Sequence, residues 1–188
     1  MEQSKIKLLA IELGESLGDA VLYSFSLSEL TKFKKEFHLE EIENAEQEYL
    51  YLLLFLSTYA CQIAFINNQN LAHAILDRFH QYMAENRAKL PLKIPEDQEL
   101  QEKLRKRYAQ YYELSRTKEC SIDVSFLAKQ LPYDFFSNVL QKDLHYIFND
   151  EDFREQWGQS TVKLGLLVGE YLTEMAVAIS RIKDKYKM

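Results

Sequence analysis

One stretch of this sequence carries no charge at all: residues 49–76 contain no Asp, Glu, Lys or Arg. Such a stretch either crosses a membrane or lies in the core of a folded domain. Tyr, Ser, Thr and Gln side chains dilute it, and Asn67–Asn70 end its most apolar part. Glutamates precede it, without the Lys or Arg expected beside a cytoplasmic membrane anchor. We therefore predict that residues 49–66 belong to a buried central helix.

Apolar residues recur at helical spacing on both sides of this stretch, which predicts further helices. The chain has only five Gly and three Pro, too few for the many turns of a β-sandwich. The expected helices cover about residues 4–22, 29–37, 40–66, 71–89, 96–117, a short piece interrupted at Pro132, 133–148 and 152–185. The pair 40–66 and 71–89 is expected to form an αα-hairpin. We predict an all-α, single-domain bundle (1–188) of about six or seven helices around the central apolar helix at about 40–66.

Charge and cysteine content bear on partners and compartment. The net charge is −6, and the densest basic run, Lys103–Arg107, has acidic neighbours on the same expected helix. This pattern is typical of a solvated face rather than of a nucleic-acid interface. Cys61 and Cys120 lie far apart, and residues 1–9 lack the apolar core of a secretory signal. We expect a cytoplasmic protein that binds no nucleic acid and does not enter a membrane.

The motifs of several enzyme classes are absent, and no family signature is evident. Gly14–Gly18 lacks the Lys-Ser/Thr ending of a phosphate-binding loop. There is no G-x-S-x-G, no H-E-x-x-H and no Glu-x-x-His of the di-iron bundles. We therefore assign no catalytic and no cofactor-binding residue, and the sequence favours a non-catalytic protein.

One cluster could hold a divalent metal. His73, Asp77 and His80 follow each other at i, i+4 and i+7, which places them on one helix face, and His and Asp are good ligands for zinc. That face points away from the apolar stripe of the same helix, whereas a metal site in a bundle faces inward. The simpler interpretation is a solvated surface, with a metal site as the alternative.

Small residues form stripes on the first and last expected helices. Gly158, Gly165, Gly169 and Ala176 share one side of the last helix, next to a broad apolar stripe that includes Trp157 and Tyr171. On the first helix, Gly14 and Gly18 share a face. Since Gly lowers helix stability by about 1 kcal/mol relative to Ala, aligned glycines indicate a close backbone contact. We predict an interface at these six small residues, either between the two terminal helices or between two copies of the chain.

These observations favour a non-catalytic helical interaction or regulatory module that self-associates or binds another protein. A second hypothesis uses the abundant Tyr and Phe side chains beside residues 49–65 as a cavity for an apolar small molecule or for contact with a membrane surface. A third is a metal-dependent enzyme built on His73, Asp77 and His80, with a fourth ligand from another helix.

Overall fold

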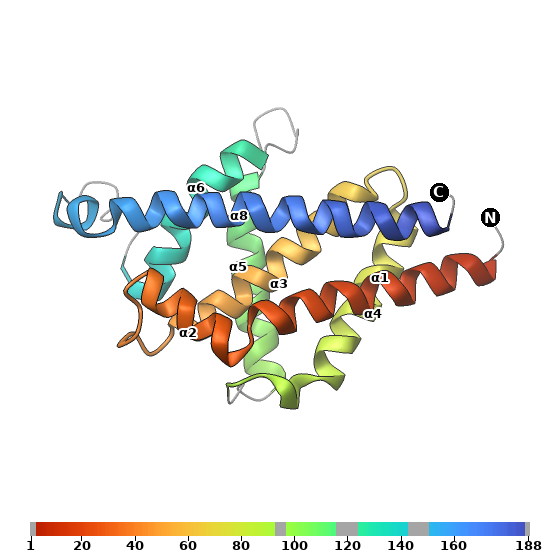
Figure 1. Ribbon diagram of the computed structural model, residues 1–188, viewed down its shortest axis with the longest axis horizontal. Helices are drawn as coiled ribbons and strands as arrows, with labels where there is room; N and C mark the ends of the chain where they lie inside the picture. Colours follow the sequence, from red (N-terminus) through yellow and green to blue (C-terminus); the bar gives the residue numbers. More distant parts are fainter. Residues whose placement is uncertain (1–2, 93–96, 116–123, 143–150, 187–188) are drawn as a thin grey trace.

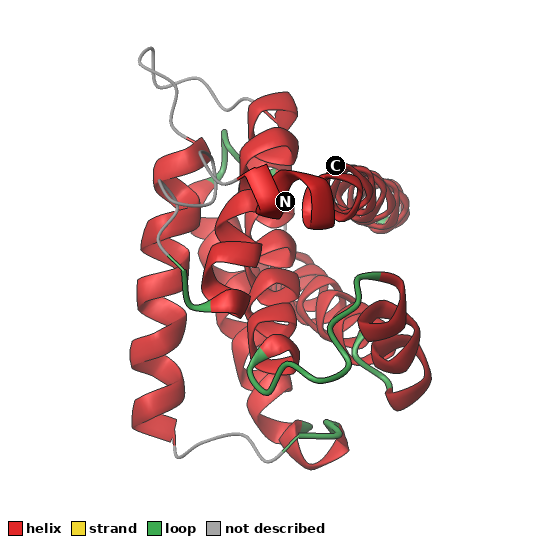
Figure 2. Cartoon of the chain, turned by 90° about the vertical axis from the view of Figure 1, so that its left-hand side faces the viewer, coloured by secondary structure: helices red, strands yellow, loops and turns green. Residues whose placement is uncertain are grey.

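A computed structural model of the chain describes residues 3–92, 97–115, 124–142 and 151–186. Within these ranges it forms helices and connecting loops without a β-strand (Figure 2). The elements are α1 (Gln3–Ser24), α2 (Leu27–Glu36), α3 (Ala45–Ala64), α4 (Gln69–Glu85), the short 3-10 helix η1 (Arg87–Lys89), α5 (Asp97–Ser115), α6 (Val124–Leu140) and α8 (Glu151–Lys185). The prediction of an all-α helical bundle is confirmed.

The central helix is α3, as its lack of charge predicts. Every residue from Glu48 to Cys61 is buried, so the helix is covered on all sides. It contacts α1, α2, α4, α5, α6 and α8. Burying an apolar side chain of the size of Leu contributes about 1.5–3 kcal/mol, so α3 is the main source of hydrophobic stabilisation. In the part of the chain that the structure describes, no helix has the length and apolar character needed to cross a membrane.

The two long terminal helices lie on one side of α3. Figure 1 shows α8 and α1 extending along the long axis of the molecule, with both chain ends at the same end. They are joined there by Glu12, which accepts hydrogen bonds from the Lys185 ammonium at 2.8 Å and from the Tyr186 hydroxyl at 2.9 Å. The helix α4 packs along the other side of α1. The molecule thus exposes one flank of α8 over its whole length.

The structure corrects the predicted start of the central helix. We expected this helix from about residue 40, but α2 ends in a tight turn and α3 begins at Ala45. His38 has a positive φ of 56°, and the Leu39 amide donates to the Lys34 carbonyl at 2.8 Å, which closes the end of α2. Asn44 then precedes α3, and its side-chain amide donates to the carbonyl of Asn138 in α6 rather than to its own helix. A contact across the fold therefore determines where α3 begins.

The structure also corrects the predicted interruption at Pro132. The helix α6 continues through Pro132 and ends at Leu140, where we expected a break and a second helix over 133–148. Proline cannot donate a backbone hydrogen bond to the carbonyl four residues earlier, here that of Ala128. Gln141, with φ 53°, closes the helix while the Lys142 amide donates to Ser137. The predicted residues 143–148 lie outside the described part of the chain.

Candidate interaction surface

The last helix has two faces of opposite character. Its bulky stripe faces the core, where Trp157, Leu164, Val168, Tyr171, Met175 and Ile179 are buried. The opposite face, which we call the outer face of α8, repeats at alternating steps of four and three residues. It consists of Val162, Leu166, Gly169, Thr173, Ala176 and Ser180, with Val177 beside them. This spacing is the heptad spacing of helices that pair with another helix.

The outer face is apolar and open to solvent. Val162 is 66% exposed, Leu166 65% and Val177 44%, which is a large exposure for side chains of this kind on one helix. No residue of this face is charged. The hydroxyl of Thr173 already donates to the carbonyl of Gly169 at 2.8 Å. The surface therefore offers apolar contact along several turns of α8, as partner-binding surfaces do.

A groove runs along one edge of the outer face, between α8 and the carboxyl-terminal half of α3. Its volume is about 380 Å³. Most of its walls are small or aliphatic side chains, and Lys183 closes one end. The lining residues are Ala60, Ile63, Ala64, Gly169, Leu172, Thr173, Ala176, Ile179, Ser180 and Lys183. Two of the six small residues singled out in the sequence, Gly169 and Ala176, thus line one apolar groove.

Three of the predicted interface glycines are covered within the chain. A Cβ atom at Gly14 would lie 2.8 Å from the carbonyl oxygen of Ile75 in α4, and one at Gly18 would lie 2.3 Å from the ring of Tyr82. A Cβ at Gly165 would lie 2.7 Å from the carbonyl oxygen of Ala128 in α6. The glycines of α1 therefore pack against α4 and not against α8, and Gly165 packs against α6. Gly14 and Gly18 are buried, and Gly165 is half-buried, so the missing Cβ of all three is explained by contacts within the chain.

The other two glycines have no such explanation within the described residues. No atom lies within 4 Å of a Cβ built at Gly158 or at Gly169. Each lies in the interior of a continuous α-helix, where Gly is less stable than Ala by about 1 kcal/mol. Ala176 is exposed. We therefore restrict the candidate interface to Gly158, Gly169, Ala176 and the apolar side chains of the outer face.

The proposed metal ligands lie on the surface of α4. His73, Asp77 and His80 are all exposed, and within the described ranges no three His, Cys, Asp or Glu side chains form a group that could hold a metal ion. One side of the His80 ring packs on Phe79, with centroids 4.9 Å apart. The resulting loss of hydration lowers the pKa of His80, and Asp77 opposes that shift. The geometry gives the metal hypothesis no support, and it stays a prediction.

A partly buried polar network joins α3, α5 and α6, and the sequence patterns did not reveal it. Arg107 binds Glu48 through two hydrogen bonds, Nε to Oε2 at 2.7 Å and Nη2 to Oε1 at 2.6 Å. Gln110, one turn along α5, donates to Asp134 at 2.7 Å and accepts from Asn138 at 3.2 Å. Charge-assisted bidentate pairs of this kind are strong and fix the relative position of their helices.

Asp134 is the exceptional member of this network. Only 3% of its surface is exposed, and its Oδ2 atom has no hydrogen-bond partner among the described residues. Burial raises the pKa of this carboxyl, while the hydrogen bond from Gln110 and the charge of Arg107 oppose the shift. Perturbed carboxyl groups occur at functional sites, but also in structural ion-pair networks. Here the carboxyl lies in the contact between α5 and α6, which is the position of a structural group.

The aromatic side chains beside α3 pack against one another. The ring of Phe55 lies 5.6 Å from Tyr59, 5.1 Å from Tyr111 and 5.2 Å from Tyr112, measured between centroids. The Tyr108 hydroxyl hydrogen-bonds Thr58 at 3.1 Å. Among the described residues these rings pack on one another, and the apolar-ligand hypothesis stays a prediction.

Comparison with known proteins adds nothing to this geometry. No protein-family model matches the chain, and no curated protein or solved structure matches it at a significant level. The function has to be inferred from the residues and contacts described above.

Proposed function

We propose that this chain is a non-catalytic helical module that acts through protein–protein contact and self-associates through the outer face of α8. The observation that supports this proposal best is Gly169. It occupies the middle of a 35-residue helix, faces an apolar groove, and has no intramolecular neighbour that requires a missing Cβ. A partner helix packed in the groove would explain why a glycine stands at position 169. Helices without a Cβ at the contact can approach more closely than the usual distance of about 8–10 Å between helix axes.

A second copy of the chain is the partner that the charges favour. The molecule carries a net charge of −6, so two copies repel each other over most contacts. The outer face is an uncharged surface where two copies can meet without placing like charges together. Across a two-fold axis the same face serves both subunits, which is the commonest form of self-association. A cytoplasmic location belongs to the same proposal, since the buried Cys61 is a free thiol.

Light scattering coupled to size exclusion tests this proposal on the purified chain and on Gly169→Leu. The new side chain meets no atom of its own chain within 4 Å at its Cβ, so the variant should fold and keep the helical circular-dichroism spectrum of the wild type. It should nevertheless dissociate toward monomer, because the branched side chain fills the close contact. Lys163→Leu is the matched control: it adds the same side chain to the charged side of α8 and should leave the mass unchanged.

A second variant separates a blocked groove from a general loss of apolar contact. Ala176→Glu places a carboxylate on the exposed outer face and should also give a monomer, through repulsion between the two copies. A wild-type chain that is monomeric at concentrations up to about 100 μM would contradict self-association. A dimer with a Kd above that value has a free energy of association no stronger than about −5 kcal/mol. Unchanged mass in both variants would show that two copies meet elsewhere.

The same groove is a candidate site for the apolar small molecule of the second hypothesis. Its volume of about 380 Å³ falls in the usual range for small-molecule sites, and Ile63, Leu172 and Ile179 supply an apolar lining. Native mass spectrometry distinguishes the two occupants. A doubled mass supports the dimer, whereas a monomer that retains a small adduct, lost in Gly169→Leu, supports the ligand.

A further inference from the structure

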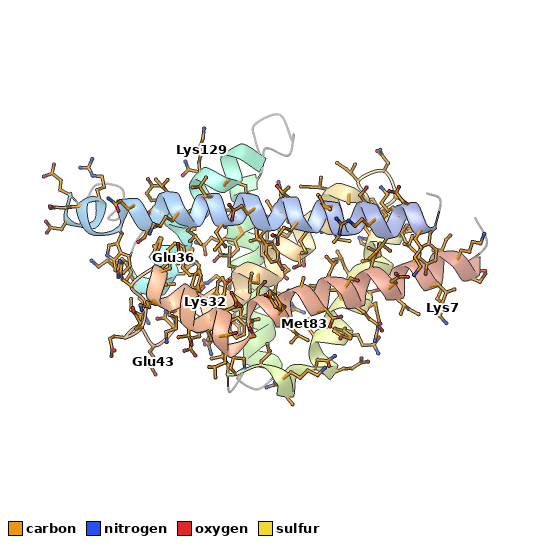
Figure 3. All side chains as sticks on the ribbon, in the orientation of Figure 1. Lys7, Lys32, Glu36, Glu43, Met83 and Lys129 are labelled. Carbon is orange, nitrogen blue, oxygen red and sulfur yellow. The ribbon has the colours of Figure 1, made fainter. Side chains whose placement is uncertain are left out.

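A second depression lies on the opposite flank of α8, where this helix passes over α1, α2 and the start of α3. We call it the acidic cleft. Its volume is about 260 Å³, and aromatic and acidic side chains make up most of its lining. The lining residues are Tyr23, Ser24, Glu29, Lys32, Phe33, Glu36, Tyr49, Leu167, Glu170, Tyr171 and Glu174. Figure 3 labels Lys32 and Glu36 on α2, the helix that lines the cleft together with α8.

The rim of the cleft carries an excess of negative charge. Four glutamates line it against a single lysine. Lys32 binds Glu29, with Nζ 2.7 Å from Oε1, and therefore neutralises one of the four. The other three, Glu36, Glu170 and Glu174, have no ion-pair or hydrogen-bond partner among the described residues. Carboxylates gathered around a concave surface attract a cation more strongly than isolated surface charges do.

The floor of the cleft is aromatic and contains an unused hydroxyl. Tyr49 is only 5% exposed, and its ring stacks on Phe33 with centroids 3.7 Å apart. The side chain of Tyr49 lines the cleft, and no described residue hydrogen-bonds its hydroxyl. Burial raises the pKa of Tyr49, so the hydroxyl stays protonated. It opens onto the cleft, where a bound donor can reach its oxygen.

We propose that the acidic cleft binds a primary ammonium group on an alkyl chain, either a lysine side chain of another protein or a free polyamine. The ammonium would donate to the Tyr49 hydroxyl and pair with the carboxylates of Glu170 and Glu174, while its methylene groups lie on the aromatic floor. Aromatic rings attract cations over their faces, and the alkyl stem of a lysine packs along apolar surface. The volume is below that of most drug-sized sites, which fits a narrow chain and not a ring system.

The cleft and the proposed self-association surface lie on different flanks of α8. Glu170 and Glu174 belong to the cleft, and Gly169 and Ala176 to the groove. This site therefore does not depend on the proposed function, and either can fail without the other.

Isothermal titration with two probes tests the site: spermidine, and the blocked tripeptide acetyl-Gly-Lys-Gly-amide. We expect at least one to bind one per chain with a Kd between about 10 μM and 1 mM. The peptide with acetylated lysine should not bind, because acetylation removes the charge. Binding of spermidine alone identifies a free amine as the ligand, and binding of the peptide identifies a protein partner. Absence of binding by both at about 5 mM would overturn the proposal.

Two variants locate the binding, and a third controls for charge. Glu170→Gln with Glu174→Gln should weaken binding at least about tenfold, while Glu151→Gln with Glu155→Gln, at the far end of the same helix, changes the net charge equally and should alter the Kd less than about twofold. Tyr49→Phe keeps the stacked ring and should weaken binding several-fold without lowering the melting temperature. If both glutamate pairs weaken binding equally, the attraction is a general effect of an acidic protein and the cleft is not the site.

Discussion

Replacing single glycines of α8 by alanine tests the packing of this helix directly, because the substitution is the same at each position and only the surroundings differ. At Gly165 the new Cβ would lie 2.7 Å from the backbone oxygen of Ala128 and 3.7 Å from Pro132. A backbone atom cannot rotate away as a side chain does, so α6 and α8 must separate. At Gly158 and Gly169 the same Cβ meets nothing within 4 Å.

The two effects can be separated by magnitude. Alanine gains about 1 kcal/mol of helix propensity at each position, and forced contacts in a packed interior cost about 1–3 kcal/mol. Gly158→Ala and Gly169→Ala should therefore be more stable than the wild type, and Gly165→Ala should be about 1–3 kcal/mol less stable than those two. For a chain of this size, 1 kcal/mol shifts the melting temperature by about 2–4 °C.

Urea unfolding followed by circular dichroism measures these differences, at a protein concentration low enough to keep the wild type monomeric, because self-association adds to stability and would cover Gly169. Equal stabilisation by all three substitutions would refute the close contact between Gly165 and Ala128. Destabilisation by all three would show that Gly158 and Gly169 are also packed against protein.

Three further predictions concern the buried polar groups and the histidines. Arg107→Met should lower the free energy of unfolding by about 3–5 kcal/mol, because it leaves the buried Glu48 carboxylate unpaired. Adding Glu48→Leu should restore most of this loss in a denaturation assay. A double variant in which the two losses simply add would contradict the prediction. Since burial raises the pKa of Asp134 in the folded state, the unfolded state releases this proton first, and stability from this group falls as pH rises from about 4 toward 7. Asp134→Asn, which can still accept from Gln110, should therefore stabilise the protein more at pH 7 than at pH 4, and a pH-independent difference would refute it. The double change His73→Ala and His80→Ala should shift stability by no more than about 0.5 kcal/mol, and zinc titration should show no tight site that the double variant loses.

Helical spacing and the absence of charge were enough to predict the bundle and its central helix. Both are properties of neighbouring residues: an uncharged helix can be covered on all sides, and α3 is. The same local argument placed Glu48 only among the glutamates that precede the uncharged stretch. The structure instead pairs it with Arg107, 59 residues further along the chain, and no local pattern indicates such a partner.

Asp134 and the glycines show the same limit. Asp134 and Asn138 lie at i and i+4 on one face of α6, and Asp134 is buried because α5 covers it with Gln110. The alignment of the small residues is evident in the sequence, but the sequence does not predict which of them pack against another helix. Gly14 and Gly165 differ from Gly169 only in what the fold places opposite them. The acidic cleft is lined by residues from four helices, so no pattern within a single helix predicts it.

The meeting of α6 and α8 joins two residues that are each unfavourable in a helix. Pro132 leaves the Ala128 carbonyl without its usual donor, and that oxygen points at Gly165, where no side chain intervenes. Each residue lowers the stability of its own helix. A scan that scored one position at a time from helix propensity alone would therefore favour replacing both. A larger residue at Gly165 is tolerated only if α6 shifts along or away from α8, because its Cβ meets the Ala128 oxygen whichever residue stands at position 132. Replacing Pro132 gives that oxygen an intrahelical donor, so a double variant tests whether the two effects on stability are coupled.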